Sequence, residues 1–280
     1  MSASASSASC LRLAVPAMAS RFECVLPRRT GTVAEEARLR AAGEAALAEV
    51  VATEHELSRF RDDSVLSRIL ARARRSPALV PPRLWEVLTL CDALVEATGG
   101  RFDPAAAYGG WRCVVLDRRE RTLRLDGDTG LDFGAIGKGV ALDRAAEALR
   151  EAGVRDALLH GGASSVFGLG RDPEGRPWRI ALADPGDAGG VHGTVRATVV
   201  LADRALGVSA PRQAHPERGV VAHVLDPATG RAVTRGPTRL AAVRARSAAA
   251  ADAWATALVV GGRREVETLD LEAPMARPPW

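Results

Sequence analysis

The chain has 280 residues, 47% of them apolar and 26% charged, which is enough to bury a large core in one domain or in two closely joined lobes. The formal net charge is only +4, and no basic block is interleaved with aromatic residues, so the composition argues against a nucleic-acid partner. No run of 18 apolar residues and no secretory signal peptide are evident, so we expect a cytoplasmic protein whose four cysteines are reduced.

Apolar spacing and turn residues divide the chain into helices and strands. The predicted helices cover residues 32–57, 64–71, 83–97, 137–152 and 247–260. The predicted strands cover residues 11–26, a hairpin within 112–133, and residues 157–170, 179–184, 194–201, 220–225 and 239–246. Because the elements mix without a regular βαβ order, the fold class is predicted to be α+β. We expect one domain over residues 11–270, with residues 1–10 and 271–280 as loosely ordered tails.

The densest chemical signal is the glycine-rich segment at residues 131–143, where a strand gives way to a helix. Gly134, Gly137 and Gly139 lie within six positions, and Lys138, the only lysine of the chain, lies among them. Glycines let backbone N–H groups approach a ligand, and the positive end of a helix attracts phosphate. The segment therefore indicates a phosphate site, with a plain strand-to-helix turn as the alternative.

A second signal lies on the Ala-rich helix predicted at residues 247–260. Asp252 and Thr256 are four residues apart and so share one face of that helix. A carboxylate and a hydroxyl among small side chains can hold a hard cation such as Mg²⁺. We expect Asp252 to lie on an exposed face, and the alternative is that both side chains only make local hydrogen bonds.

Three other segments place polar residues at turns. His223 ends an apolar strand just before residues 226–230, whose Asp-Pro-Ala-Thr-Gly sequence forms a turn without needing a function. A histidine there is either structural or a proton acceptor. Residues 98–104 form a helix end and a turn, and residues 18–23 lie on the first strand pair.

In their order along the chain, these segments resemble the ApbE family of FMN transferases from Met18 to Gly261. The matching segments are Met18 to Ser20, Ser58 to Ser64, Gly100 to Pro104, Gly134 to Asp143, His223 to Gly230 and Ala251 to Ala257. The resemblance implies two intimately packed lobes of mixed, largely antiparallel sheet with helices, and FAD in a cleft between them. It implies a magnesium-dependent flavoprotein enzyme that cleaves the FAD pyrophosphate, attaches FMN to a threonine of an acceptor protein and releases AMP.

The same resemblance assigns a role to each candidate site residue. The implied contacts to FAD are Met18, Phe60, Arg101, Phe102, Asp103, Gly134, Lys138, Val140, Asp143, Leu225 and Asp226. The implied ligands of Mg²⁺ are the side chains of Asp252 and Thr256 and the backbone carbonyl of Gly137. His223 is the implied base that takes the proton from the acceptor hydroxyl.

Two segments depart from the family pattern. Residues 161–165 read Gly-Gly-Ala-Ser-Ser where the family has Gly-Gly-Asp or Gly-Gly-Asn, so we expect at most a hydroxyl contact there. Residues 207–210 read Gly-Val-Ser-Ala in place of Ala-Thr-Ser-Gly. FAD pyrophosphatase activity, with water as the acceptor, and a non-catalytic flavin-binding protein stay open as alternatives, and the sequence gives no oligomeric state.

Overall fold

The computed structural model describes residues 10–183, 195–215, 219–222, 224–234, 237–264 and 266–271, without the side chains of residues 212–222. Most of the two predicted tails, residues 1–9 and 272–280, lies outside the described residues. Cys10 begins the first strand, and Leu271 is buried against the core.

Within the described residues, seven strands form the main sheet. Their spatial order is β1 (Cys10–Ala17), β2 (Ser20–Pro27), β6 (Ala157–Gly161), β7 (Ser165–Leu169), β10 (Arg204–Ser209), β15 (Leu240–Ala245) and β16 (Val266–Asp270). Neighbouring strands are antiparallel except β15 and β16, which run parallel. The mixed, largely antiparallel α+β fold predicted from the sequence is confirmed.

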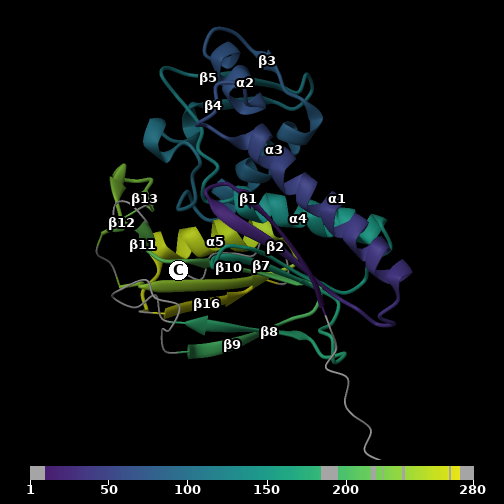
Figure 1. Cartoon of the computed structure of the whole chain (residues 1–280). Helices are drawn as coiled ribbons and strands as arrows, with labels where there is room; N and C mark the ends of the chain where they lie inside the picture. The colour runs from purple at the N-terminus through teal and green to yellow at the C-terminus, as the bar shows by residue number, and fades with distance from the viewer. Residues whose placement is uncertain are drawn as a thin grey trace, which may run out of the picture.

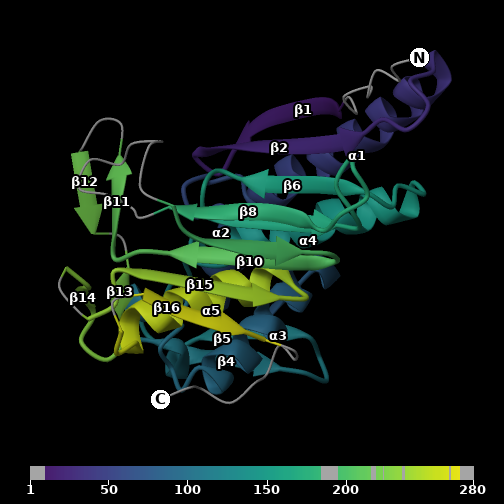
Figure 2. The same cartoon turned by 90° about the horizontal axis from the view of Figure 1, so that it is seen from below.

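Different elements pack on the two faces of this sheet (Figures 1 and 2). The helices α1 (Val33–Leu57), α4 (Gly137–Glu151) and α5 (Ala248–Gly261) lie on one face. The hairpin of β8 (Trp178–Ala183) and β9 (Val195–Leu201) lies on the other, where Trp178 and Leu201 pack against Val166 and Leu206. The sheet is therefore the middle layer of three.

Capping residues set where the helices of this layer begin. Thr32 accepts a hydrogen bond from the backbone N–H of Glu35 at 3.2 Å, and the Glu35 carboxylate accepts from the N–H groups of Thr30 and Gly31. The first contact satisfies an N–H group that has no partner inside the helix, and the second holds the preceding loop against the start of α1. α5 is apolar all round and almost wholly buried, which its small alanine side chains allow because the sheet and α4 can both approach closely.

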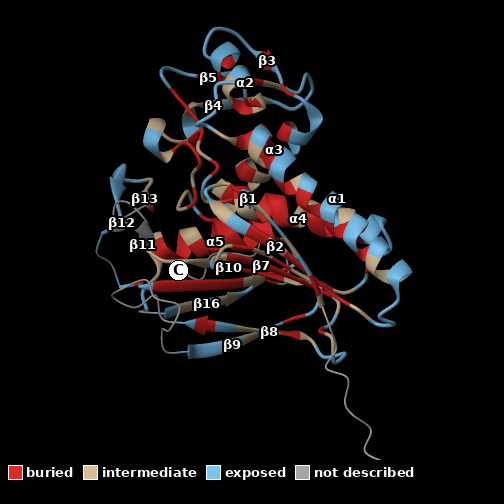
Figure 3. Ribbon diagram, in the orientation of Figure 1, coloured by how far each residue is buried: buried red, intermediate tan, exposed pale blue. Residues whose placement is uncertain are grey.

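A smaller lobe lies above the helix layer in Figure 1. It contains α2 (Val65–Ala73), α3 (Pro82–Ala97) and a three-stranded sheet in the order β3 (Ala78–Leu79), β5 (Thr122–Leu125), β4 (Val114–Asp117). Two short 3₁₀ helices, η1 (Ala106–Tyr108) and η2 (Trp111–Cys113), complete it. One continuous apolar core joins Leu66, Leu84 and Leu123 of this lobe to α4 and α5. Figure 3 shows many buried residues, in red, along these two helices. The two lobes are therefore intimately packed.

The remaining described strands form two small hairpins beside the C-terminal end of α5. They are β11 (Arg212–His215) with β12 (Gly219–Ala222), and β13 (Leu225–Asp226) with β14 (Arg231–Ala232). No helix in the described part of the chain is long and apolar enough to cross a bilayer.

The predicted helices are all present, but the strand prediction needs correction. The segment at 157–170 is a hairpin of β6 and β7. The central strand β10, the edge strand β16 and the short strands β3, β11 and β14 were not predicted. β10 lacks an alternating pattern because it is covered on both faces, and Gly207 replaces a side chain where α5 packs directly on it: a Cβ atom at Gly207 would lie 2.4 Å from the backbone carbon of Ala251.

Candidate functional site

The site begins where the N-terminal ends of α4 and α5 meet. Gly139 permits this contact, because a Cβ atom there would lie 2.4 Å from the carbonyl carbon and oxygen of Ala248. Asp143, one turn further along α4, accepts hydrogen bonds from the Ser247 hydroxyl and the Ala248 N–H, both at 2.7 Å, and from the Ala249 N–H at 3.0 Å. Its carboxylate therefore caps α5 and joins the two helices, although burial raises its pKa above the usual range.

Asp252 lies in the same junction, and the expectation that it would be exposed was wrong. Only 8% of the residue is accessible, because α5 is enclosed between the sheet and α4. Its carboxylate accepts hydrogen bonds from the Ser165 hydroxyl, at 2.9 Å to Oδ1 and 2.8 Å to Oδ2. Burial raises the pKa of Asp252 to about 7, with a further rise from the Asp143 charge, against the lowering effects of Lys138 and these hydrogen bonds.

Asp252 and Thr256 also make the local contact expected of their spacing. The Thr256 hydroxyl donates to the backbone carbonyl of Asp252 at 3.1 Å, so its oxygen keeps lone pairs for another partner. No cluster of three or more acidic, His or Cys side chains suited to a metal occurs among the described residues. A cation here would use one carboxylate together with hydroxyl and backbone oxygens, a donor set that suits a hard ion.

The glycine-rich segment offers fewer backbone donors to a phosphate than its sequence predicts. The Gly134 N–H donates to Asp132 Oδ1 at 2.8 Å, and the Gly137 N–H donates to the Phe133 carbonyl at 2.7 Å. The positive end of α4 and the charge of Lys138 are therefore the main attractions for an anion at this place.

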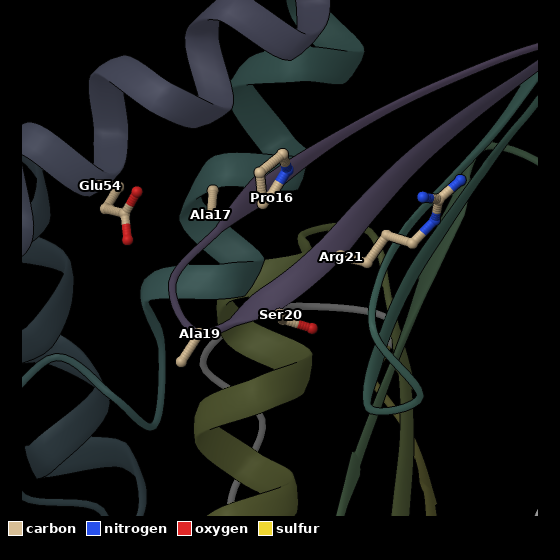
Figure 4. A pocket seen from close by; sticks show the side chains of 6 residues that line it. All are labelled: Pro16, Ala17, Ala19, Ser20, Arg21 and Glu54. Carbon is tan, nitrogen blue, oxygen red and sulfur yellow. The ribbon is translucent and has the colours of Figure 1, made fainter. Parts of the chain in front are cut away.

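Met18 reaches the same junction from the turn between β1 and β2. Its sulfur would lie 4.0 Å from a Cβ atom placed on Gly137. Met18 and Ala19 both have positive φ, at 51° and 52°, and the Met18 N–H donates to Glu54 Oε1 of α1 at 2.6 Å. Figure 4 shows Glu54 beside this turn, at an open cavity of about 530 Å³ lined by Pro16, Ala17, Ala19, Ser20, Arg21 and Glu54. α1 thus holds a strained turn against the glycine-rich segment.

Phe60 is connected to the glycine-rich segment through two neighbours. It is 80% exposed, and the Arg59 guanidinium lies 4.1 Å from the centre of its ring. Arg59 Nε also contacts Asp132 Oδ2 at 2.8 Å, and Asp132 is the residue that binds the Gly134 N–H. An exposed aromatic ring beside a glycine-rich loop is available to stack on a planar ligand.

Arg101 and Asp226 line a second cavity, of about 340 Å³, at the C-terminal end of α5. Its lining residues are Gly99, Gly100, Arg101, Asp226, Pro227, Ala228, Val260 and Gly261. Arg101 passes so close to α5 that a Cβ atom at Gly261 would lie 2.1 Å from Arg101 Nε. The cavity therefore brings together the end of α3, the β13–β14 turn and the end of α5.

The other predicted contacts are held by the fold itself. Phe102 is 1% exposed and belongs to the core, as does Val140 at 6%. Asp103 accepts from the N–H groups of Ala105 at 2.7 Å and Trp111 at 2.9 Å, which organises the loop that carries Arg101. Leu225 is half-buried next to Asp226. His223 lies outside the described residues, so its proposed role rests on the sequence alone.

Comparison with known proteins shows the family of the chain. The ApbE family model matches residues 18–108 and 105–274. The chain belongs to the ApbE family. It is similar to an FAD:protein FMN transferase of Rhodobacter capsulatus, with 39% identity over 138 residues, which are 48% of this chain and 25% of that protein. It is also similar to an FAD:protein FMN transferase of Klebsiella pneumoniae, with 25% identity over 86% of this chain and 77% of that protein.

Two solved ApbE structures share the fold. An ApbE protein from Thermotoga maritima superposes with a TM-score of 0.76 at 20% identity, covering 90% of this chain and 87% of its own. The flavin transferase ApbE from Vibrio cholerae gives a TM-score of 0.73 at 22% identity over the same shares of the two chains. At this identity the likeness shows the fold.

Within this ApbE fold, the structure reveals two contacts that sequence reasoning did not find. Glu54 carries no motif, so its bond to Met18 had no signal in the sequence. Ser165 lies in the segment that departs from the ApbE pattern, and its hydroxyl bonds the Asp252 carboxylate. The hydroxyl contact predicted for that segment is therefore directed to a protein carboxylate.

Proposed function

We propose that this protein is an FAD:protein FMN transferase, which cleaves the pyrophosphate of FAD, attaches FMN to a threonine of an acceptor protein and releases AMP. The observation that carries the proposal is the buried carboxylate of Asp252 beside Lys138 and the positive end of α4. The relatives from Rhodobacter and Klebsiella carry the name of this activity, and membership of the ApbE family supports it here.

Asp252, Thr256 and the carbonyl of Gly137 would hold Mg²⁺ in this site. A buried carboxylate whose pKa is raised to about 7 is a poor anion by itself, and a bound cation restores its charged form. When bound, Mg²⁺ would neutralise negative charge on the pyrophosphate.

The chain itself supplies orientation, charge and a base. The positive end of α4 and the Lys138 ammonium favour the pyrophosphate at the α4–α5 junction. Met18 lies at that junction, Phe60 is exposed beside Arg59, and Arg101 and Asp226 line the cavity at the C-terminal end of α5. These residues would bind the two nucleotide parts of FAD. His223 would take the proton from the attacking threonine hydroxyl. The threonine oxygen would then bond to the FMN phosphorus while AMP leaves.

The test combines the protein with FAD, Mg²⁺ and an acceptor domain that carries a flavinylation threonine. We expect covalently bound flavin, seen as a fluorescent band on a denaturing gel, and one AMP per FMN attached. His223→Ala should still bind FAD and Mg²⁺ but transfer nothing, and extra Mg²⁺ should not rescue it. Free FMN and AMP without any bound flavin would identify water as the acceptor, and FAD binding without AMP release would exclude catalysis.

A further inference from the structure

We infer that Ser165 is a positioning residue that orients the Asp252 carboxylate toward the cation, an inference that rests on the proposed function. Asp252 is on α5 and Ser165 is on β7, 87 residues earlier in the chain. Their hydrogen bond crosses from the sheet layer to the helix layer. It is the means by which the sheet controls the direction of a carboxylate carried by a helix.

The backbone of Ser165 is held on both sides, because β7 is an inner strand of the main sheet. Ser165 pairs with Gly161 of β6 on one side and with Gly207 of β10 on the other. The residue before it, Ser164, accepts a hydrogen bond from the Val208 N–H at 2.7 Å. Ser165 has no exposed surface, and its Oγ also lies 3.5 Å from the Oγ of Ser164.

The geometry of the contact explains what this position achieves. The hydroxyl lies 2.9 Å from Oδ1 and 2.8 Å from Oδ2, so one proton is shared between both oxygens of the carboxylate. Such a symmetrical contact fixes the rotation of the carboxylate plane about its last bond. The remaining lone pairs of Asp252 are then available in one fixed direction, as a cation ligand requires.

A plain structural role is the competing explanation, because a buried hydroxyl needs a partner in any fold. The two roles differ in what removal of the hydroxyl changes. A structural role predicts a loss of stability with unchanged metal binding. A positioning role predicts weaker Mg²⁺ binding, since loss of a group that orients a metal ligand typically lowers metal affinity about 10–100-fold.

The experiment measures Mg²⁺ binding without FAD, as the rise in melting temperature of the whole chain when Mg²⁺ alone is added. In Ser165→Ala we expect the half-saturating Mg²⁺ concentration to rise about 10–100-fold. In turnover with FAD, the same variant should need more Mg²⁺ but approach the wild-type kcat when Mg²⁺ saturates. Ser165→Cys replaces the hydroxyl by a thiol, which is somewhat larger and a weaker donor, and should give an intermediate rise. This variant carries the test if the alanine variant does not fold.

Ser64→Ala is the matched control. Ser64 is also fully buried, and its hydroxyl accepts from the Ser67 N–H at 2.9 Å, where it caps α2 away from Asp252. It should lower the melting temperature and leave the half-saturating Mg²⁺ concentration unchanged. The inference is overturned if both Ser165 variants bind Mg²⁺ like the wild type, or if Ser64→Ala weakens Mg²⁺ as much.

Failure of the proposed function gives a different result. If Mg²⁺ does not stabilise the wild type, the metal site is wrong and the role of Ser165 falls with it. If Mg²⁺ binding weakens in the Ser165 variants but no acceptor is flavinylated, the positioning role stands and the transfer reaction is wrong.

Discussion

Replacing Asp252 by asparagine should make the metal-free protein more stable while it abolishes most of its activity. The pKa of Asp252 rises from 3.8 to about 7 on folding, chiefly because the carboxylate is buried. At ~1.36 kcal/mol per pH unit, this amounts to a penalty of ~4 kcal/mol for the ionised carboxylate in the fold. An amide carries no such penalty, but it loses hydrogen bonds that only a carboxylate accepts, at a cost of ~1–3 kcal/mol. The net gain expected at pH 8 is ~1–3 kcal/mol.

The pH dependence gives this prediction its sign. Between pH 3.8 and about 7 the unfolded chain has released the Asp252 proton, while the folded chain still holds it. Stability of the wild type should therefore fall as pH rises through this window and then level off above pH 7. The advantage of Asp252→Asn should be absent near pH 4 and complete at pH 8.

The assay is urea unfolding in the presence of a chelator at pH 4.5, 6 and 8, repeated with Mg²⁺. Added Mg²⁺ should stabilise the wild type more than the variant. Turnover of FAD should fall by about a hundredfold or more, corresponding to ~2.7–4 kcal/mol of lost charge stabilisation, with partial recovery in excess Mg²⁺.

Asp172→Asn is the control, because its effect on stability at pH 8 should have the opposite sign. Asp172 is also only 8% accessible, but it carries an ion pair. Burial raises its pKa, and the hydrogen bonds and ion pair with Arg176 outweigh this effect and lower the pKa below its ordinary value. Its stabilising effect is present above its ordinary pKa and is lost as pH falls, so this variant should be less stable than the wild type at pH 8. If metal-free Asp252→Asn is also less stable than the wild type at pH 8, the reasoning about the buried charge is refuted.

Three other substitutions test the packing around the site. Gly139→Ala should cost ~1–3 kcal/mol in urea unfolding, because its Cβ atom would meet the Ala248 backbone at 2.4 Å; an unchanged midpoint would contradict this. Ala19→Gly should raise stability by up to ~1 kcal/mol by relieving a φ of 52°, and a loss in the same assay would show that the turn is unstrained. Gly261→Ala should keep the fold but displace Arg101 and raise the KM for FAD; an unchanged KM would remove Arg101 from the binding cavity.

The sequence by itself determined the helices, the α+β class and the family. Helix ends are written locally, as in Thr32 with Glu35 or Ser247 before α5, so a short window of sequence is enough to find them. The ordered segments from Met18 to Ala257 indicated the ApbE family, and the family match over residues 18–274 confirmed it. The roles assigned to individual residues remain predictions, including that of His223.

Only the tertiary structure decided how Asp252 is used. Alanine surrounds Asp252 on α5, and alanine is common on both exposed and buried helix faces. The sequence of the helix therefore does not show which kind of face holds Asp252. Burial follows from two close approaches, of α4 at Gly139 and of β10 at Gly207, which bring together segments more than 40 residues apart in the chain. The same long-range contacts supply Ser165 as a partner and raise the pKa of the carboxylate to about 7. Such effects depend on which layers meet, and local sequence patterns do not contain that information.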